Sequence, residues 1–288
     1  MIIDSHAHYA HFRFNGEHPY LCDRNGEWAE GRADRDQLLD DLKKNGIVGS
    51  IEPSIEFENI ENQLALVSAH KESMWAALGV HPTRCINTPW KKRKKLKKYA
   101  KENNVIAIGE TGLDYHYPRK EQYRFRQKMW FMYQIMLSDC LKLPLVLHVR
   151  DADEDALKIL KRHKKHLRGG VAHCFKSDHT VAEQYIELGF AIGVGGKLFS
   201  NNEEGEALRD TVKRAPLTSL LVETDAPLVL PDLRGSCFSN SKIGKLRNTS
   251  LILPAVIRRI AEIRGEDPES VEDAIYQNTL RVFNLKTK

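Results

Sequence analysis

Residues 105–110 read Val-Ile-Ala-Ile-Gly-Glu, a short run of apolar and β-branched residues that ends on a carboxylate. Such a run is typical of a strand that is buried on both faces, as in a parallel sheet. Similar runs recur along the chain, and longer amphipathic segments separate them. This alternation predicts an α/β protein in which crossover helices join parallel strands.

Eight such runs can be counted, centred on residues 2–3, 47–51, 75–80, 105–108, 145–147, 171–172, 190–194 and 219–222. Helices are expected over 35–44, 60–71, 121–141, 153–165, 180–188, 251–263 and 268–283. Eight strands with intervening helices favour a closed (β/α)₈ TIM barrel over an open sheet. The chain of 288 residues suits one such domain, 1–288, and its longest irregular stretches are a loop inserted at 9–32 and residues 231–248.

The bulk composition is that of a globular protein, with 41% hydrophobic and 29% charged residues. Five scattered cysteines without a Cys-x-x-Cys pair favour a reducing, cytoplasmic setting. The sequence opens on an apolar strand, shows no export leader and has no apolar stretch near the roughly 18 residues of a membrane span. We therefore expect neither export nor membrane insertion.

The net charge of +5 comes from one place, since Lys91 to Lys98 contains seven basic residues in eight. A helix carrying this run would either bind an anionic partner or present a solvated outer face.

His6 and His8 are separated by one residue at the end of the first predicted strand. Because side chains alternate across a strand, both imidazoles point to the same side, at the mouth of the barrel. Neutral imidazoles in this arrangement are good ligands for a divalent ion, although an isolated His-x-His is also common in ordinary loops.

Four further polar residues also stand where an apolar run ends, and strand ends converge at the C-terminal face of a barrel, where active sites lie. The predicted metal ligands are thus His6, His8, Glu110, His148, His173 and Asp225. They suffice for two divalent ions, either Mg, Mn or Zn, which can activate a bridging water for hydrolysis. Glu110 suits a bridge between the ions, Asp225 can also accept a proton from the attacking water, and Glu223 either orients a ligand histidine or forms an internal salt bridge.

Six segments in this order resemble those of the TatD-family metal-dependent deoxyribonucleases of the amidohydrolase superfamily. They are DSHAH (4–8), GVHP (79–82), IGETGLDY (108–115), LHVRDA (147–152), AHCF (172–175) and VETDAP (222–227). The resemblance extends from Asp4 to about Phe283 and includes the pair Arg247-Asn248. It implies a (β/α)₈ barrel, the same six metal ligands, and exonucleolytic hydrolysis of DNA phosphodiester bonds by a metal-bound hydroxide.

Three more residues are expected to bind substrate phosphates. His81 either touches the scissile phosphate or is a loop histidine held by Pro82, and Arg150 either binds phosphate or pairs with Asp151 or Asp153. Arg247 is the third. The substrate is DNA or RNA, with no membrane and no obligate protein partner implied.

The chain departs from the family pattern in two places. The insert at 9–32 either contacts substrate as a lid or is a surface loop, and it contains His11, Arg13, His18, Arg24, Trp28 and Arg32. Asn248-Thr249-Ser250 replaces the acidic or amide residue and proline that commonly follow the Arg-Asn pair of the family. Both departures concern substrate preference.

Two other classes of function are consistent with these residues. A small-molecule amidohydrolase or phosphotriesterase would use the same site to activate water, and would show no salt-sensitive binding of DNA. A non-catalytic binding module would keep its binding when the metal site is emptied.

Overall fold

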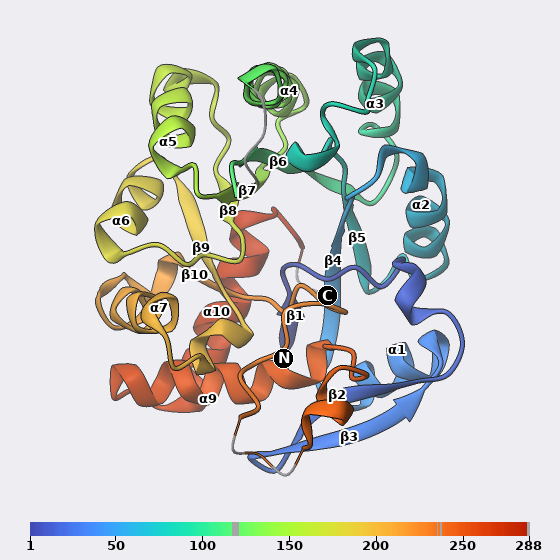
Figure 1. The fold of residues 1–288 in the computed structure, drawn as a ribbon, viewed down its shortest axis with the longest axis vertical. Coiled ribbons are helices and arrows are strands. Elements are labelled where there is room, and N and C mark those ends of the chain that lie inside the picture. The colour runs from blue at the N-terminus through green and yellow to red at the C-terminus, as the bar shows by residue number, and fades with distance from the viewer. Residues whose placement is uncertain (117–120, 235, 237, 287–288) are drawn as a thin grey trace. The chain divides into compact units, whose positions relative to one another are not determined.

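All eight predicted strands are present in the protein's computed structural model, which describes residues 1–116, 121–234, 236 and 238–286. Hydrogen bonding places the eight strands in one sheet in chain order (Figure 1). They are β1 (Ile2–Asp4), β4 (Ile47–Pro53), β5 (Met74–Ala77), β6 (Val105–Asp114), β7 (Leu145–Arg150), β8 (Gly170–Ala172), β9 (Phe190–Val194) and β10 (Leu220–Val222).

The chain divides into two compact units, each built from several segments. Unit 1 consists of Met1–Ile51, Cys174–His179 and Gly193–Thr279, and unit 2 of Glu52–His173, Thr180–Ile192 and Leu280–Lys288. That these two units form a single domain, 1–288, stays a prediction.

In unit 1, β1 pairs in parallel with β4, and the helices include α1 (Arg35–Lys44), α7 (Glu203–Arg214), α8 (Asn240–Ile243) and α9 (Leu253–Arg264). Helix α1 begins with a capping box, in which Asp34 and Gln37 each accept a hydrogen bond from the other's backbone N–H. Helix α9 ends at Gly265, whose φ of 66° suits a glycine at a helix C-terminus. Helix α7 was not predicted, although Asn202 caps it by accepting from the Gly205 N–H.

The prediction of an irregular loop at 9–32 is wrong for most of that segment. Residues His18–Arg24 and Glu27–Ala33 form an antiparallel hairpin, β2 and β3 (Figure 1). Asn25 and Gly26 make the connection with φ angles of 54° and 96°, as a two-residue hairpin turn requires. Asn-Gly between two such runs is a strong hairpin signal, and it was available in the sequence.

The hairpin is held against unit 1 by Tyr20. A Cβ atom on Gly31 would lie 2.2 Å from Tyr20 Cζ, so only glycine lets this ring lie across β3. The Tyr20 hydroxyl then donates to Asp41 Oδ2 of α1 at 3.3 Å. The insert is therefore an ordered part of unit 1.

In unit 2, the helices α2 (Ile60–Ala69), α3 (Arg93–Tyr99), α4 (Glu121–Leu141) and α5 (Asp153–Arg162) alternate with the strands, and α6 (His179–Glu187) and α10 (Pro268–Val282) contribute to both units. Helix α4 packs on β6 and buries Trp130 and Gln134 completely. The Gln134 amide accepts from Val80 N at 2.7 Å and donates to Thr111 Oγ1, also at 2.7 Å. One side chain thus ties the segment after β5 to β6.

We expect Gln134→Leu to lower the free energy of unfolding by about 2–4 kcal/mol, because it leaves the Val80 N–H and the Thr111 hydroxyl buried without this partner. Met136→Ala on the same helix is the control, since Met136 is exposed, and it should change stability little. Urea denaturation followed by circular dichroism measures both. Equal stabilities of the two variants would show that the Gln134 bridge contributes nothing.

Candidate metal centre

The backbone of unit 1 brings the end of β1 beside the segment that follows β10. Ser5 N donates to Val222 O at 3.0 Å, Asp225 N to His6 O at 2.8 Å, and His8 N to Ala226 O at 2.7 Å. Asp225 adopts a positive φ of 57°, which Asp tolerates better than most residues. This short ladder places the two histidines opposite Asp225.

The side chains of these three residues converge. His6 Nε2 lies 3.1 Å from His8 Nε2, and Asp225 Oδ1 lies 3.1 Å from His8 Nε2 and 3.6 Å from His6 Nε2. Their ligand atoms fall within 4.8 Å of one another. Two imidazole nitrogens and a carboxylate oxygen that face one another in this way suit a divalent cation.

Asp4 is a buried residue that the sequence analysis did not single out. It accepts hydrogen bonds from groups next to the ligands His6 and Asp225. It accepts from Thr224 Oγ1 and Ser250 Oγ at 2.6 Å each, from Thr224 N at 3.1 Å and from His6 N at 3.0 Å. Complete burial raises the pKa of Asp4 to about 6, although these hydrogen bonds act to lower it. Asp4 therefore fixes the neighbours of both His6 and Asp225.

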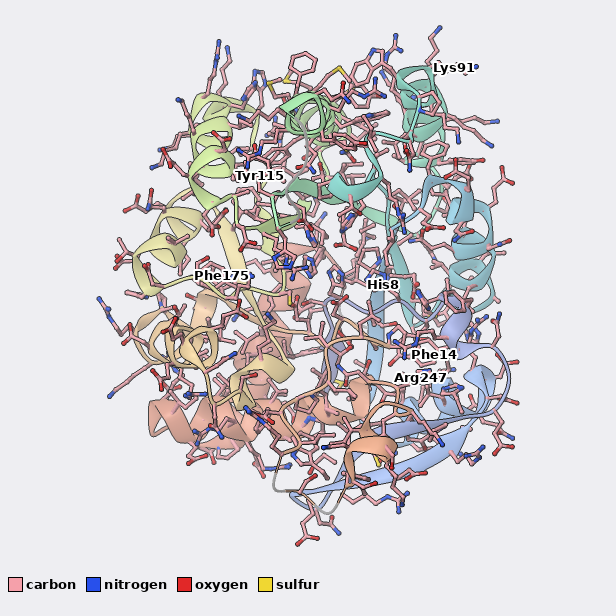
Figure 2. All side chains as sticks on the ribbon, viewed as in Figure 1. His8, Phe14, Lys91, Tyr115, Phe175 and Arg247 are labelled. Atoms are coloured by element: carbon pink, nitrogen blue, oxygen red, sulfur yellow. The ribbon has the colours of Figure 1, made fainter. Side chains whose placement is uncertain are left out.

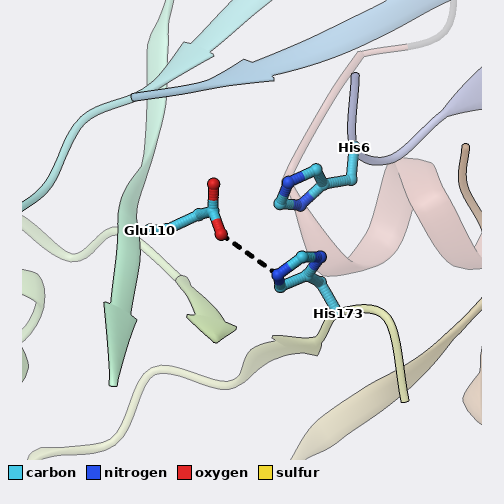
Figure 3. Close-up of side chains that lie close together, drawn as sticks. All are labelled: His6, Glu110 and His173. Carbon is cyan, nitrogen blue, oxygen red and sulfur yellow. Dashed lines mark ion pairs between the residues drawn. The ribbon is translucent and has the colours of Figure 1, made fainter. Parts of the chain in front are cut away.

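Unit 2 contains a second cluster, centred on Glu110. Its Oε2 lies 3.0 Å from His173 Nε2, an ion pair shown in Figure 3, and 3.3 Å from His148 Nδ1. The two imidazoles approach each other at 3.2 Å. One carboxylate and two histidines, carried by β6, β7 and the residue that follows β8, make a second set of metal ligands.

The strand that carries Glu110 is longer than predicted and irregular at this residue. Ile108 pairs with Leu145 and Thr111 with Leu147, so β6 has two residues between these pairs where β7 has one. An extra residue of this kind is a β-bulge, which turns a side chain away from the regular alternation. The bulge directs Glu110 toward the histidines of β7 and the end of β8.

Asp114, near the end of the same strand, was missed by the sequence analysis. Its Oδ2 lies 3.1 Å from His148 Nε2, so the imidazole presents Nδ1 to Glu110. Burial by itself would lower the pKa of His148, but the hydrogen bonds to Asp114 and Glu110 raise it to about 9. A carboxylate behind a ligand histidine is the usual means of fixing its orientation and tautomer.

His81 lies among the ligand atoms of unit 2. Its Nε2 is 3.2 Å from His148 Nδ1 and 3.5 Å from Glu110 Oε2, while Nδ1 contacts Thr83 at 2.8 Å. Burial, followed by the charge of His148, lowers the pKa of His81 to about 3. The structure thus places this residue within the cluster rather than at its rim.

The remaining predicted residues have distinct surroundings. Glu223 accepts a hydrogen bond from the backbone N–H of Cys174. Arg150 makes no ion pair with any described carboxylate, whereas Asp151 pairs with His116 and Asp153 accepts from Tyr185. The alternative in which Arg150 pairs with Asp151 or Asp153 is therefore wrong.

The two members of the Arg-Asn pair play different parts. Asn248 is fully buried, and its amide donates to Thr224 O at 2.8 Å and to Val229 O at 3.0 Å, on either side of Asp225. Arg247 is only partly buried and donates to Lys245 O at 2.8 Å. Asn248 thus supports the loop that carries a ligand.

The basic run forms α3 and the turn before it. Lys92 and Lys95 form ion pairs with Glu58 and Glu61, next to and within α2, while Lys91 is exposed (Figure 2). Leu96 is the buried anchor of α3. Part of the charge is thus balanced within unit 2, as expected for a solvated face.

The family model described as TatD related DNase matches residues 3–284. A Rahnella sp. protein named 3'-5' ssDNA/RNA exonuclease TatD is 32% identical over 256 residues, which cover 88% of this chain and 94% of the relative. A protein of the same name from Erwinia tasmaniensis is 30% identical over 257 residues, with the same coverage.

Solved structures agree. YJJV, a TatD homolog from Escherichia coli K12, superposes with a TM-score of 0.80 at 28% identity and covers 99% of this chain and 98% of its own. A TatD-family hydrolase from Entamoeba histolytica gives 0.78 at 21% identity, covers 99% of this chain and 98% of its own, and supports the fold. The predicted (β/α)₈ barrel and the predicted family are confirmed.

Proposed function

Because the chain belongs to the TatD-related DNase family, we propose that it is a 3'–5' exonuclease acting on single-stranded DNA or RNA with two divalent ions. It is a metal-dependent hydrolase of phosphodiester bonds. The observation that carries the proposal is the presence, in each unit, of a buried cluster whose histidine and carboxylate atoms face one another.

One ion is assigned to His6, His8 and Asp225 in unit 1, and the other to Glu110, His148 and His173 in unit 2. The donor sets support both assignments, since each combines imidazole nitrogens with a carboxylate oxygen. Divalent ions at such sites lower the pKa of water and stabilise charge on the attacking and leaving oxygens. Mg, Mn and Zn are all compatible with these ligands.

Asp225 is assigned the role of accepting the proton of the attacking water. Its side chain is 16% exposed, against 0% for His6 and 4% for His8, so it is the member of its cluster that solvent reaches most readily. A carboxylate within hydrogen-bonding reach of the water can accept its proton as the bond to phosphorus forms.

Arg150 and Arg247 are assigned to substrate phosphates, since neither is paired with a described carboxylate and guanidinium groups bind phosphate through two parallel hydrogen bonds. His81 is assigned to the phosphate nearest the ions, on the basis of its place beside Glu110 and His148. Glu223 is assigned the orientation of the segment after β8, through Cys174 N.

No helix in the described part of the chain is long and apolar enough to cross a membrane. The described cysteines Cys22, Cys85, Cys140 and Cys174 are all free thiols, which supports the proposal of a reducing, cytoplasmic setting.

The test is hydrolysis of end-labelled single-stranded DNA and RNA by protein stripped with a chelator, with one divalent metal restored at a time. We expect no cleavage without metal, and one-nucleotide products from the 3' end when a suitable ion is added. Cleavage that survives chelation would contradict the assignment. Turnover of small esters or amides with no salt-sensitive binding of DNA would favour the rival reading, a small-molecule amidohydrolase or phosphotriesterase.

A further inference from the structure

The chain makes a tight turn immediately after the ligand His8. His11 N donates to His8 O at 3.0 Å, and Phe14 N donates to His11 O at 3.0 Å. Phe14 is completely buried and its ring packs 5.0 Å from that of Tyr9, whose hydroxyl is hydrogen-bonded to Ser250. The position of the turn relative to His8 is therefore fixed.

Phe12, at the tip of this turn, is exposed to an unusual degree. It is 72% exposed, whereas Phe14, two residues later, is buried. Its ring stacks on His11 with centroids 4.4 Å apart and an interplanar angle of 29°. The turn thus presents a supported aromatic surface close in sequence to a metal ligand.

Arg13 follows Phe12 in this turn, and a second arginine, Arg247, is hydrogen-bonded to Arg13. Arg247 Nε donates to the main-chain oxygen of Arg13 at 3.3 Å, and the backbone of Arg247 is bonded to Pro19 and Leu21 of β2. Neither arginine forms an ion pair with any carboxylate in the described ranges, so their charges repel each other without a bridging acid. Burial, and then the charge of Arg13, lower the pKa of Arg247, as expected when two cations are held together.

A turn that carries an exposed aromatic ring and an arginine without a described acidic partner, with a second such arginine bonded to its main chain, has the chemistry of a nucleotide subsite. The ring can stack on any unpaired base, and the arginines can bind the adjoining phosphate. Bases in a duplex already stack on their neighbours, so this surface discriminates in favour of unpaired chains. His8, Phe14 and Arg247, all of unit 1, are labelled in Figure 2.

We propose that Phe12, supported by His11, is a base-stacking platform for an unpaired nucleotide, and that Arg13 and Arg247 bind that nucleotide's phosphate. The inserted segment thereby selects single-stranded substrates. This inference rests on the proposed nuclease function and assigns part of its specificity to residues outside the metal clusters.

The experiment measures binding without turnover. Full-length protein stripped of metal is titrated into fluorescent oligo(dT) and into an abasic chain of the same length, and anisotropy gives the two dissociation constants. Phe12→Ala is expected to weaken binding of oligo(dT) about 5–10-fold, within the range for loss of one stacked base. It should leave binding of the abasic chain unchanged, because that chain has no base to lose.

Three further variants make the result specific. Phe12→Trp should restore binding and Phe12→Leu should not, since leucine keeps apolar bulk without a π-face. Phe125→Ala removes a phenylalanine that is 66% exposed on α4, and it should bind both chains as the wild type does. Equal losses from Phe12→Ala and Phe125→Ala would overturn the proposal.

The phosphate part is tested by Arg13→Ala in the same assay. It should weaken binding of both chains by a similar factor and reduce the slope of log affinity against log salt by about 0.7, the value for one lost single-strand phosphate contact. An unchanged slope would contradict the assignment of Arg13.

The outcomes separate this inference from the proposed function. If the wild type cleaves single-stranded DNA but Phe12→Ala binds it equally well, the platform is wrong and the nuclease assignment stands. If the wild type neither binds single-stranded DNA nor cleaves it when metal is restored, both are wrong. Binding of duplex as tight as that of single strands, unaffected by Phe12→Ala, would also overturn the platform.

Discussion

Asp225→Asn is expected to lower kcat for hydrolysis of single-stranded DNA by about 10²–10⁴-fold, the usual loss when a positioned proton acceptor is removed. The amide has nearly the same shape as the carboxylate but cannot accept the proton of water, and it is a weaker partner for His6 and His8 and for an ion. The fold should survive, because the hydrogen bonds that place residue 225 run through the backbone, from Asp225 N to His6 O and from His8 N to Ala226 O. Single-turnover hydrolysis with saturating metal measures the effect.

Asp210→Asn is the matched control for this substitution. Asp210 is an acidic residue of unit 1 that pairs with Arg214 on the exposed face of α7, so its loss should leave kcat unchanged. Both variants should give the circular dichroism spectrum of the wild type. Wild-type turnover by Asp225→Asn would remove Asp225 from the chemistry.

His8→Ala and His148→Ala are each expected to reduce bound metal from two ions to one and to lower kcat/KM roughly 10²-fold or more. Each histidine belongs to the cluster of a different unit, so each substitution should empty one site. Mutation of a residue that only hydrogen-bonds to a metal ligand typically costs about 10–100-fold in metal affinity or activity. Removal of a ligand itself should cost at least as much. Equilibrium dialysis followed by elemental analysis counts the ions.

His163→Ala controls for the loss of any histidine. Its Nδ1 contacts Ile159 O at the end of α5, so this variant should keep both ions and full activity. Loss of both ions from His8→Ala alone would contradict the assignment of a separate ligand set to each ion. Retention of both ions by His148→Ala would remove His148 from the ligand set.

The strands illustrate how much of the fold a local pattern carries. Each of the eight predicted apolar runs is a strand, and β9 (Phe190–Val194) has the predicted bounds. This is because parallel strands buried on both faces consist of nearly continuous apolar residues. The inserted hairpin could also have been predicted from Asn25-Gly26, whose positive φ angles connect β2 to β3. It was missed because charged and polar residues stand in both strands and leave no long apolar run.

The candidate site was predictable where a residue follows a strand directly. His6 and His8 fall together because side chains alternate along an extended chain, and the structure places their Nε2 atoms 3.1 Å apart. The apolar pattern predicted that the fourth strand ends near Ile108. The strand in fact continues to Asp114, and a bulge turns Glu110 toward the histidines of unit 2.

By itself, the sequence of this protein determined the strand order, the family and the types of residue that can bind metal, because these follow from local periodicity and short motifs. Only the tertiary structure decided which side chains hydrogen-bond to the ligands or to their neighbours. Asp4 meets Thr224 and Ser250 across 220 and 246 residues, and Asp114 meets His148 across 34. Hydrogen bonds between residues so distant in the chain leave no periodic trace, since they depend on how strands and loops are brought together.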